Sequence, residues 1–171
     1  MKKLLLLFVC ISFGLSESWA QYNRTETAIP ESEVPELIKK MHQEKYPGAF
    51  VTSWQVKTDK VATTPNPIYV VNFKLDGRQG HKSFYTETDG FMAYIGFINQ
   101  YDLPEPIQVY ATQYLEDDYI KYGQIIQLEK PYIFLYRVKV NNKGQLEYFY
   151  FDKYGNKIDK KNIAPKVFSY I

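Results

Sequence analysis

The sequence predicts an α+β fold of two tandem units, each with one helix packed on a four-stranded antiparallel sheet. A helical pattern followed by several strand patterns with alternating apolar residues occurs twice along the chain. One alternating segment also recurs at a constant offset, with Tyr69, Val71, Phe73 and Leu75 matched by Phe134, Tyr136, Val138 and Val140. The predicted divisions are a signal peptide at 1–20, a flexible leader at 21–30, the first unit at 31–99, the second unit at 100–159 and a C-terminal tail at 160–171.

The first residues have the three parts of a secretory signal peptide. Met1–Lys3 is basic, Leu4–Leu15 is largely apolar, and Ser18–Ala20 offers small residues for cleavage after Ala20. The apolar run is shorter than the roughly 20 residues that a membrane-spanning helix needs. We therefore expect an exported protein, periplasmic or extracellular, with no stable membrane span after cleavage. The polar, aperiodic residues that follow predict the flexible leader.

Cys10, the only cysteine among the 171 residues, lies inside the apolar run. Val9 is bulkier than the small residue that lipoprotein processing prefers before an acylated cysteine, and the apolar run continues beyond Cys10. Cleavage after Ala20 is therefore favoured over acylation. The exported chain then has no cysteine, so disulfides and thiol chemistry are excluded and stability must come from packing.

In the first unit, an apolar stripe at helical spacing contains Leu37, Ile38 and Met41. Pro35 is tolerated in the first turn because its missing N–H has no partner there, and Pro47 with the glycine after it ends the helix. Four strands follow, at Phe50–Lys57, Ile68–Leu75, Lys82–Glu87 and Phe91–Ile98, with turns at Asp76–Gly77 and Thr88–Gly90.

The second unit repeats this plan. Its helix has five apolar residues at helical spacing, which are Ile107, Tyr110, Ala111, Tyr114 and Leu115. The predicted strands are Gly123–Glu129, Tyr132–Val140, a strand that starts at Gln145 and closes in a turn on Gly155, and Asn156–Ile158. In the tail, Lys166–Tyr170 has the pattern of a short edge strand.

The order of these elements across residues 30–158 resembles the PepSY-like family of secreted Bacteroidetes proteins. The matching features are the short helix containing proline, Tyr46–Gly48, the strand bearing Trp54, Tyr69–Phe73, and Phe151–Asn156. The resemblance implies a fold like that of the β-lactamase inhibitor protein, in two copies, and a binding or inhibitory role without catalytic residues. The first copy departs from the pattern, since Thr86–Glu87 stands where the second has Phe151–Asp152.

No metal or cofactor site is predicted. His42 falls on the exposed side of the first helix and His81 begins a strand, so we expect two solvated histidines without further ligands at suitable spacing. The turns at Glu87–Gly90 and Asp152–Asn156 supply one or two carboxylates each, fewer than a calcium site needs. Ordinary turn chemistry explains them.

Enzymatic and nucleic-acid functions also lack support in the sequence. There is no Gly-x-Ser-x-Gly motif, no glycine-rich phosphate loop and no nucleophile beside a base. The acidic run Glu116–Asp118 ends a helix and is expected to be a solvated loop rather than a cation site. The formal net charge of +2 comes without any basic block interleaved with aromatic residues, so no nucleic-acid surface is predicted.

The unusual feature of the composition is its 16 tyrosines. If Phe84, Phe149 and Phe151 face the helices, strand alternation places an aromatic and aliphatic surface on the opposite face of the sheet. The candidate partner-binding residues on that surface are Tyr85, Tyr148, Tyr150, Ile133 and Leu135, with Ile68 and Val70 beside them. Two interpretations stay open: the face binds a partner, or the two units, the tail or a second copy cover it.

The sequence therefore favours a secreted, non-catalytic protein that binds another protein or a peptide through an aromatic sheet face, with inhibition of a protease or other hydrolase as one form of that role. The alternative is an envelope module that senses or binds a small ligand. An open aromatic face would favour the first function, and a closed pocket between the units would favour the second.

Overall fold

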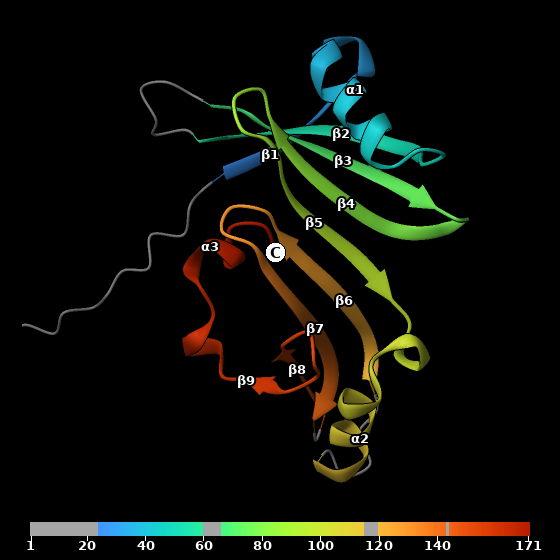
Figure 1. The fold of residues 1–171 in the computed structure, drawn as a ribbon, viewed down its shortest axis with the longest axis vertical. Helices are drawn as coiled ribbons and strands as arrows, with labels where there is room; N and C mark the ends of the chain where they lie inside the picture. The colour runs from blue at the N-terminus through green and yellow to red at the C-terminus, as the bar shows by residue number, and fades with distance from the viewer. Residues whose placement is uncertain (1–23, 60–65, 115–119, 143) are drawn as a thin grey trace, which may run out of the picture.

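The computed structural model describes residues 24–59, 66–114, 120–142 and 144–171, and in these residues all strands belong to one antiparallel sheet (Figure 1). The sheet has nine strands, and each strand pairs with its neighbours in sequence order. The strands are β1 (Arg24–Ile29), β2 (Phe50–Asp59), β3 (Ile68–Leu75), β4 (Arg78–Thr86), β5 (Gly90–Ile98), β6 (Ile120–Leu128), β7 (Ile133–Asn142), β8 (Gln145–Phe151) and β9 (Lys157–Ile158).

Three α-helices accompany the sheet in the same part of the chain, and a 3₁₀ turn comes before each of them. The helices are α1 (Glu36–Lys45), α2 (Glu105–Tyr114) and α3 (Pro165–Phe168). The 3₁₀ turns are Glu31–Glu33, Gln100–Asp102 and Lys160–Asn162. No helix among the described residues is both long enough and apolar enough to cross a membrane.

The prediction of two tandem helix-plus-sheet units is wrong, because the two sets of strands form one sheet. Strand β5 pairs with β6 along its length, from Ala93 opposite Leu128 to Ile98 opposite Gly123. The last strand of the predicted first unit and the first strand of the second would each leave a row of unpaired backbone groups if they stood apart. Pairing them satisfies both rows and makes the sheet continuous.

The leader also differs from its prediction. Residues 24–29, expected to be flexible, form β1 and pair with β2 from Arg24 opposite Asp59 to Ile29 opposite Trp54. The predicted signal peptide at 1–20 lies outside the described residues.

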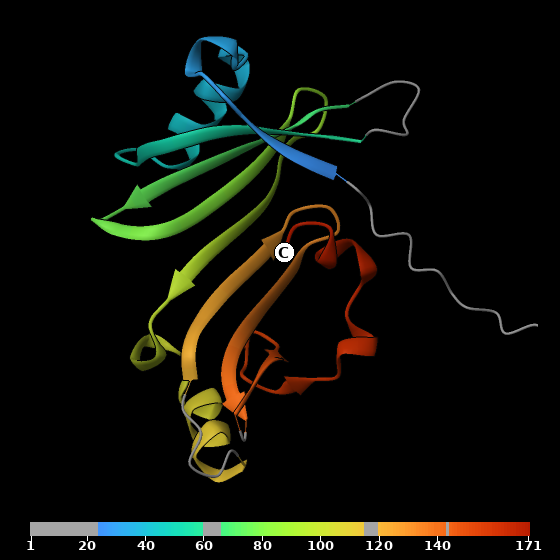
Figure 2. The ribbon, with the colours of Figure 1, turned by 180° about the vertical axis from the view of Figure 1, so that it is seen from behind.

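Helices α1 and α2 pack on the same face of the bent sheet, one near each end (Figures 1 and 2). Tyr94 and Ile98 point to this helix face from β5; Tyr94 packs with the α1 core and Ile98 with the α2 core. Ala93 and Ile95 point to the opposite, inner face. There they meet the C-terminal segment, residues 160–171, which lies inside the bend of the sheet.

The C-terminal segment buries apolar residues against both halves of the sheet. Ile163, Val167 and Tyr170 share one buried core with Val70 and Phe84 of the first half. The residues of the second half in this core are Ile126, Leu128, Leu135 and Tyr150. The segment therefore links strands that are far apart in the sheet, through a common apolar contact.

The edge strand predicted at Lys166–Tyr170 is wrong, because this stretch contains α3. Each α-helix is preceded by a buried apolar residue, with a second one four positions later. These pairs are Val34 with Ile38, Leu103 with Ile107, and Ile163 with Val167. Pro165 fits the first turn of α3, where no N–H is needed. The tail thus repeats the helix entry of the two earlier helices.

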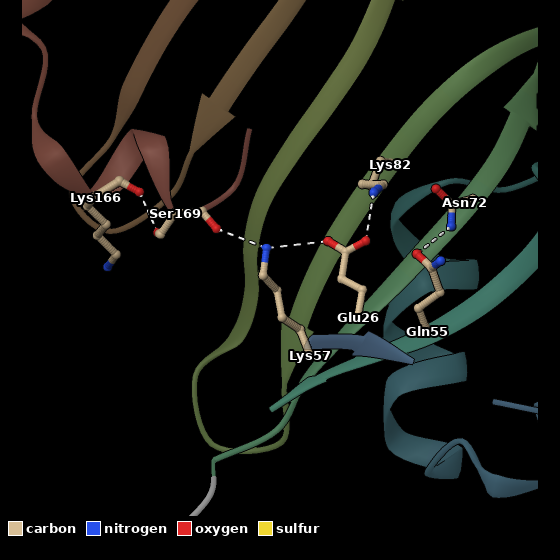
Figure 3. Close-up of polar contacts among 7 residues, drawn as sticks. All are labelled: Glu26, Gln55, Lys57, Asn72, Lys82, Lys166 and Ser169. Carbon is tan, nitrogen blue, oxygen red and sulfur yellow. Dashed lines mark hydrogen bonds and ion pairs between the residues drawn. The ribbon is translucent and has the colours of Figure 1, made fainter. Parts of the chain in front are cut away.

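A polar contact fixes the C-terminal segment beside the apolar core (Figure 3). The ammonium of Lys57 donates to the backbone oxygen of Ser169 at 3.2 Å and to the carboxylate of Glu26 at 3.3 Å. Glu26 also accepts from Lys82 at 3.3 Å. Burial alone would raise the pKa of Glu26, but the two lysines outweigh it and lower this pKa. The Glu26 carboxylate thus joins β1, β2 and β4, and the Lys57 ammonium joins them to the tail.

Replacing Val167 by alanine tests the role of the tail. Val167 is completely buried, so we expect Val167→Ala to lower the free energy of unfolding by about 2 kcal/mol in urea denaturation. Val109→Ala is the matched control, because Val109 is 40% exposed on α2 and its loss should change stability by less than about 0.5 kcal/mol. Equal effects of the two substitutions on the free energy of unfolding would contradict a stabilising role of the C-terminal segment.

Candidate functional site

Strand β4 turns its side chains to the faces opposite from those predicted. In the second half, Val138 pairs with Phe149. The constant offset between the halves predicts the same pairing for Phe73 and Phe84. Instead, Phe73 pairs with His81, an odd number of residues before Phe84. Because side chains alternate along a strand, this shift moves Phe84 to the inner face and the residue after it to the helix face.

The five predicted partner-binding residues therefore do not form one exposed surface. Tyr85 is fully buried beneath α1. Tyr150 and Leu135 lie on the face opposite the helices, as predicted, but each is only 5% exposed because the C-terminal segment covers them. Ile133 packs at the edge of the same core. Tyr148 alone of the five is largely exposed, at 42%.

Ile68 and Val70, predicted beside these residues, also belong to the buried inner core. Of the two interpretations that the sequence left open, the structure supports coverage by the tail for this part of the sheet. The aromatic and aliphatic character of the face is explained by packing.

The two histidines are buried, which corrects the expectation that both are solvated. His42 points from α1 into the core, where its Nδ1 lies 3.1 Å from the Tyr85 hydroxyl and 3.3 Å from that of Ser83. Nδ1 of His81 lies 2.7 Å from the hydroxyl of Tyr94. Burial lowers the pKa of His42 to about 4 and also lowers that of His81, so both rings are neutral at pH 7.

This buried cluster is packed among aromatic rings. The Nε2 atoms of His42 and His81 are buried without a hydrogen-bond partner among the described residues, and aromatic rings surround both side chains. No group of three or more histidine, cysteine, aspartate or glutamate side chains that could hold a metal ion occurs in the described part of the chain. In the turn considered for calcium, Asp152 accepts hydrogen bonds from Tyr154 and Asn156.

The exposed part of the inner face has a different character. We call it the basic aromatic patch, and it consists of Phe97, Tyr122, Arg137, Lys139 and Tyr148. Strand register places these five side chains on one face, in adjacent positions of β5 to β8. Phe97 is 45% exposed and Tyr148 is 42% exposed, whereas phenylalanine side chains are more often buried.

Both cations of the patch lie over tyrosine rings. The guanidinium of Arg137 is 4.7 Å from the centre of the Tyr148 ring, and its Nε donates to the side-chain oxygen of Gln124 at 2.8 Å. The ammonium of Lys139 is 5.6 Å from the ring centre of Tyr122 and 5.7 Å from that of Tyr148. Neither cation forms an ion pair with any described carboxylate.

The patch also favours negative charge at one of its own groups. The hydroxyls of Tyr122 and Tyr148 are 3.3 Å apart. This hydrogen bond, together with the nearby positive charges of Lys139 and Arg137, lowers the pKa of Tyr148 even though burial opposes the shift. The same hydrogen bond raises the pKa of Tyr122, so the positive charges of Lys139 and Arg137 are the part of this effect that a carboxylate from outside would share.

Gly80 of β4 leaves room for Phe97 on the neighbouring strand β5. Its φ of 88° belongs to the left-handed region, and a Cβ atom there would stand 2.8 Å from the Cβ of Phe97. The ring of Phe97 packs on that of Tyr122 in β6, with 4.9 Å between the ring centres. The Tyr122 hydroxyl in turn lies 3.3 Å from that of Tyr148 in β8.

A cavity of about 410 Å³ adjoins the patch on the side of the C-terminal segment. Arg137 of the patch and the neighbouring Gln124 line this cavity. Its other lining residues include Asn72, Lys74, Lys82, Ile95 and Tyr170. Lys82 is paired with Glu26, whereas Lys74 and Arg137 form no ion pair with a described carboxylate.

Four of the five patch residues were not recognised from the sequence. A signal was present in Tyr136–Val140, where Arg137 and Lys139 alternate with apolar residues that pack beneath α2. Two cations in consecutive positions on the face opposite a buried stripe indicate an exposed basic surface.

Comparisons with known proteins place the chain in no family. No family model matches it, and no curated protein matches it. One solved structure, a Bacteroides thetaiotaomicron protein proposed to be calcium-regulated and periplasmic, is 19% identical, with 78% of this chain and 94% of that chain covered and a TM-score of 0.34. The resemblance to the PepSY-like family stays a prediction.

The buried histidines predict loss of stability in mild acid. An unfolded histidine takes up its proton near pH 6.5, but His42 in the fold does so only near pH 4. Between these values the unfolded state holds more protons, so the stability present above pH 6.5 falls as the pH falls, by roughly 3 kcal/mol at pH 4 for this group.

Urea denaturation across this pH range measures the effect. His42→Gln keeps a hydrogen-bonding side chain near Tyr85 but cannot titrate, so its unfolding free energy should decline less steeply between pH 6.5 and 4 than that of the unchanged protein. Lys40→Gln, on the exposed side of the same helix, serves as the control and should keep the original decline. An unaltered decline in His42→Gln would show that His42 is not responsible.

Proposed function

We propose that this protein is an exported, non-catalytic binding protein whose basic aromatic patch engages an acidic segment of a partner protein. Export is inferred from the signal-peptide pattern at residues 1–20. The observation that carries the binding role is the pair Arg137 and Lys139, two cations held over tyrosine rings without a described carboxylate partner.

Three features of the patch support a protein or peptide as the ligand. Its exposed rings, Phe97 and Tyr148, offer apolar area at little cost in side-chain entropy, and such aromatic anchors are common at binding surfaces. Its cations are already oriented by Gln124 and by the tyrosine rings, which lowers the entropy lost on binding. Its position on paired strands gives the patch a rigid base.

The adjoining cavity supports a second candidate function, the binding of a small anionic ligand. A volume of about 410 Å³ suits a small molecule, and Arg137 with the amide of Gln124 supplies donors for a carboxylate. The peptide function is favoured because Lys139 and the rings of Phe97, Tyr122 and Tyr148 extend beyond the residues that line the cavity.

A labelled peptide that alternates glutamate and threonine tests the proposed function by fluorescence anisotropy. We expect it to bind the unchanged protein, with affinity falling as salt rises because exposed charges are screened. Arg137→Gln and Lys139→Gln should each weaken binding roughly tenfold, the loss of one charge-assisted hydrogen bond.

The matched control is Lys40→Gln, which removes the same charge on the helix face and should leave the affinity unchanged. Asn72→Leu separates the two candidate functions, because it alters the cavity and leaves the patch intact. Peptide affinity unchanged by Arg137→Gln and Lys139→Gln would contradict the proposed function, and loss of affinity in Asn72→Leu alone would favour the cavity.

A further inference from the structure

One edge of the sheet is incompletely covered next to the basic aromatic patch. Strand β8 pairs with β7 along its whole length, from Gln145 opposite Asn142 to Phe151 opposite Tyr136. On its other side, only Tyr150 and Phe151 pair with β9. Among the described residues, 145–149 therefore have no strand partner on that side, and alternate residues present their backbone N–H and C=O groups outward.

The sequence of this edge contains few of the features that usually prevent strand addition. Residues 145–149 are Gln-Leu-Glu-Tyr-Phe, with one charged residue and no proline. Leu146 is 58% exposed and Tyr148 is 42% exposed. Natural sheets generally protect an edge with charges, proline or a bulge.

The two faces beside this edge differ in charge. Leu146, Tyr148 and Tyr150 point to the inner face, where Lys139 lies opposite Tyr148 and Arg137 lies opposite Tyr150. Glu147 and Phe149 point to the helix face. A strand added at the edge would place every second side chain beside Tyr148 and the cations, and the remaining side chains beside Glu147.

We propose that the 145–149 edge of β8 binds an extended peptide segment as an additional strand, with acidic residues at alternate positions facing Arg137 and Lys139. The inference rests on the proposed function and specifies how the acidic partner is recognised. Backbone hydrogen bonds to β8 supply affinity, and the cations beside Tyr148 select for acidic side chains on one face of the peptide. Neutral residues suit the positions beside Glu147.

The experiment compares four peptides of alternating glutamate and threonine against the full protein by fluorescence anisotropy. The first is unmodified, the second has its glutamates grouped together, the third is N-methylated at every glutamate, and the fourth is N-methylated at every threonine. Because alternate residues of an added strand hydrogen-bond to the edge, one of the two methylated peptides should lose at least tenfold in affinity while the other binds like the unmodified peptide. The grouped isomer should bind more weakly than the alternating one.

The outcomes separate this inference from the proposed function. If both methylated peptides bind like the unmodified peptide, or both lose affinity equally, strand addition is overturned, although sensitivity to Arg137→Gln would still support the proposed function. If no acidic peptide binds, both proposals fail. A dimer in solution, seen by sedimentation, that excludes the peptide would also overturn the inference, because the edge would then be occupied by a second copy of the chain.

Discussion

The packing of the C-terminal segment into the bend of the sheet is the interaction on which the rest of the structure depends. A nine-stranded antiparallel sheet with helices on only one face would leave a broad apolar surface on the other. Ile163 and Val167 close this surface, and burial of such side chains contributes roughly 1.5–3 kcal/mol each. Because their core includes residues of both β3 and β7, the segment also holds the two halves in one arrangement.

The same packing determines which part of the inner face is left for binding. Where the tail covers the sheet, the side chains are apolar or tightly paired, as with Lys57 and Glu26. Beyond it, the face changes to aromatic rings and to cations that have no carboxylate partner among the residues the structure describes. The patch lies beside the incomplete edge of β8, so one region combines backbone hydrogen-bonding capacity, apolar rings and positive charge. Each of these features alone has ordinary structural explanations, and their coincidence motivates the binding function.

Local structure could be predicted from the sequence further than its assembly. The first two helices and most strands lie where apolar periodicity placed them, because period and breakers are local properties. The pairing of β5 with β6 could not be predicted from periodicity, because periodicity does not determine which other segment pairs with the edge of a strand. Tyr85 was assigned to the wrong face because the β3–β4 pairing shifts by an odd number of residues relative to β7–β8.

The tail helix could have been found from Ile163, Pro165 and Val167, whose spacing repeats the earlier helix entries. Of the candidate site, only Tyr148 was predicted in an exposed position.

The central claim is that the sheet and its C-terminal segment form one cooperative body rather than two units. Denaturation of the chain from Gln21 onward, followed by tryptophan fluorescence and far-ultraviolet circular dichroism, tests it most directly, since Trp54 in β2 is then the only tryptophan. Trp54 lies in the core beneath α1 and reports on the first half, whereas circular dichroism reports on the whole fold. One transition with coincident midpoints is the expected result. Two separate transitions, with fluorescence changing at a different denaturant concentration from the remaining secondary structure, would contradict the claim.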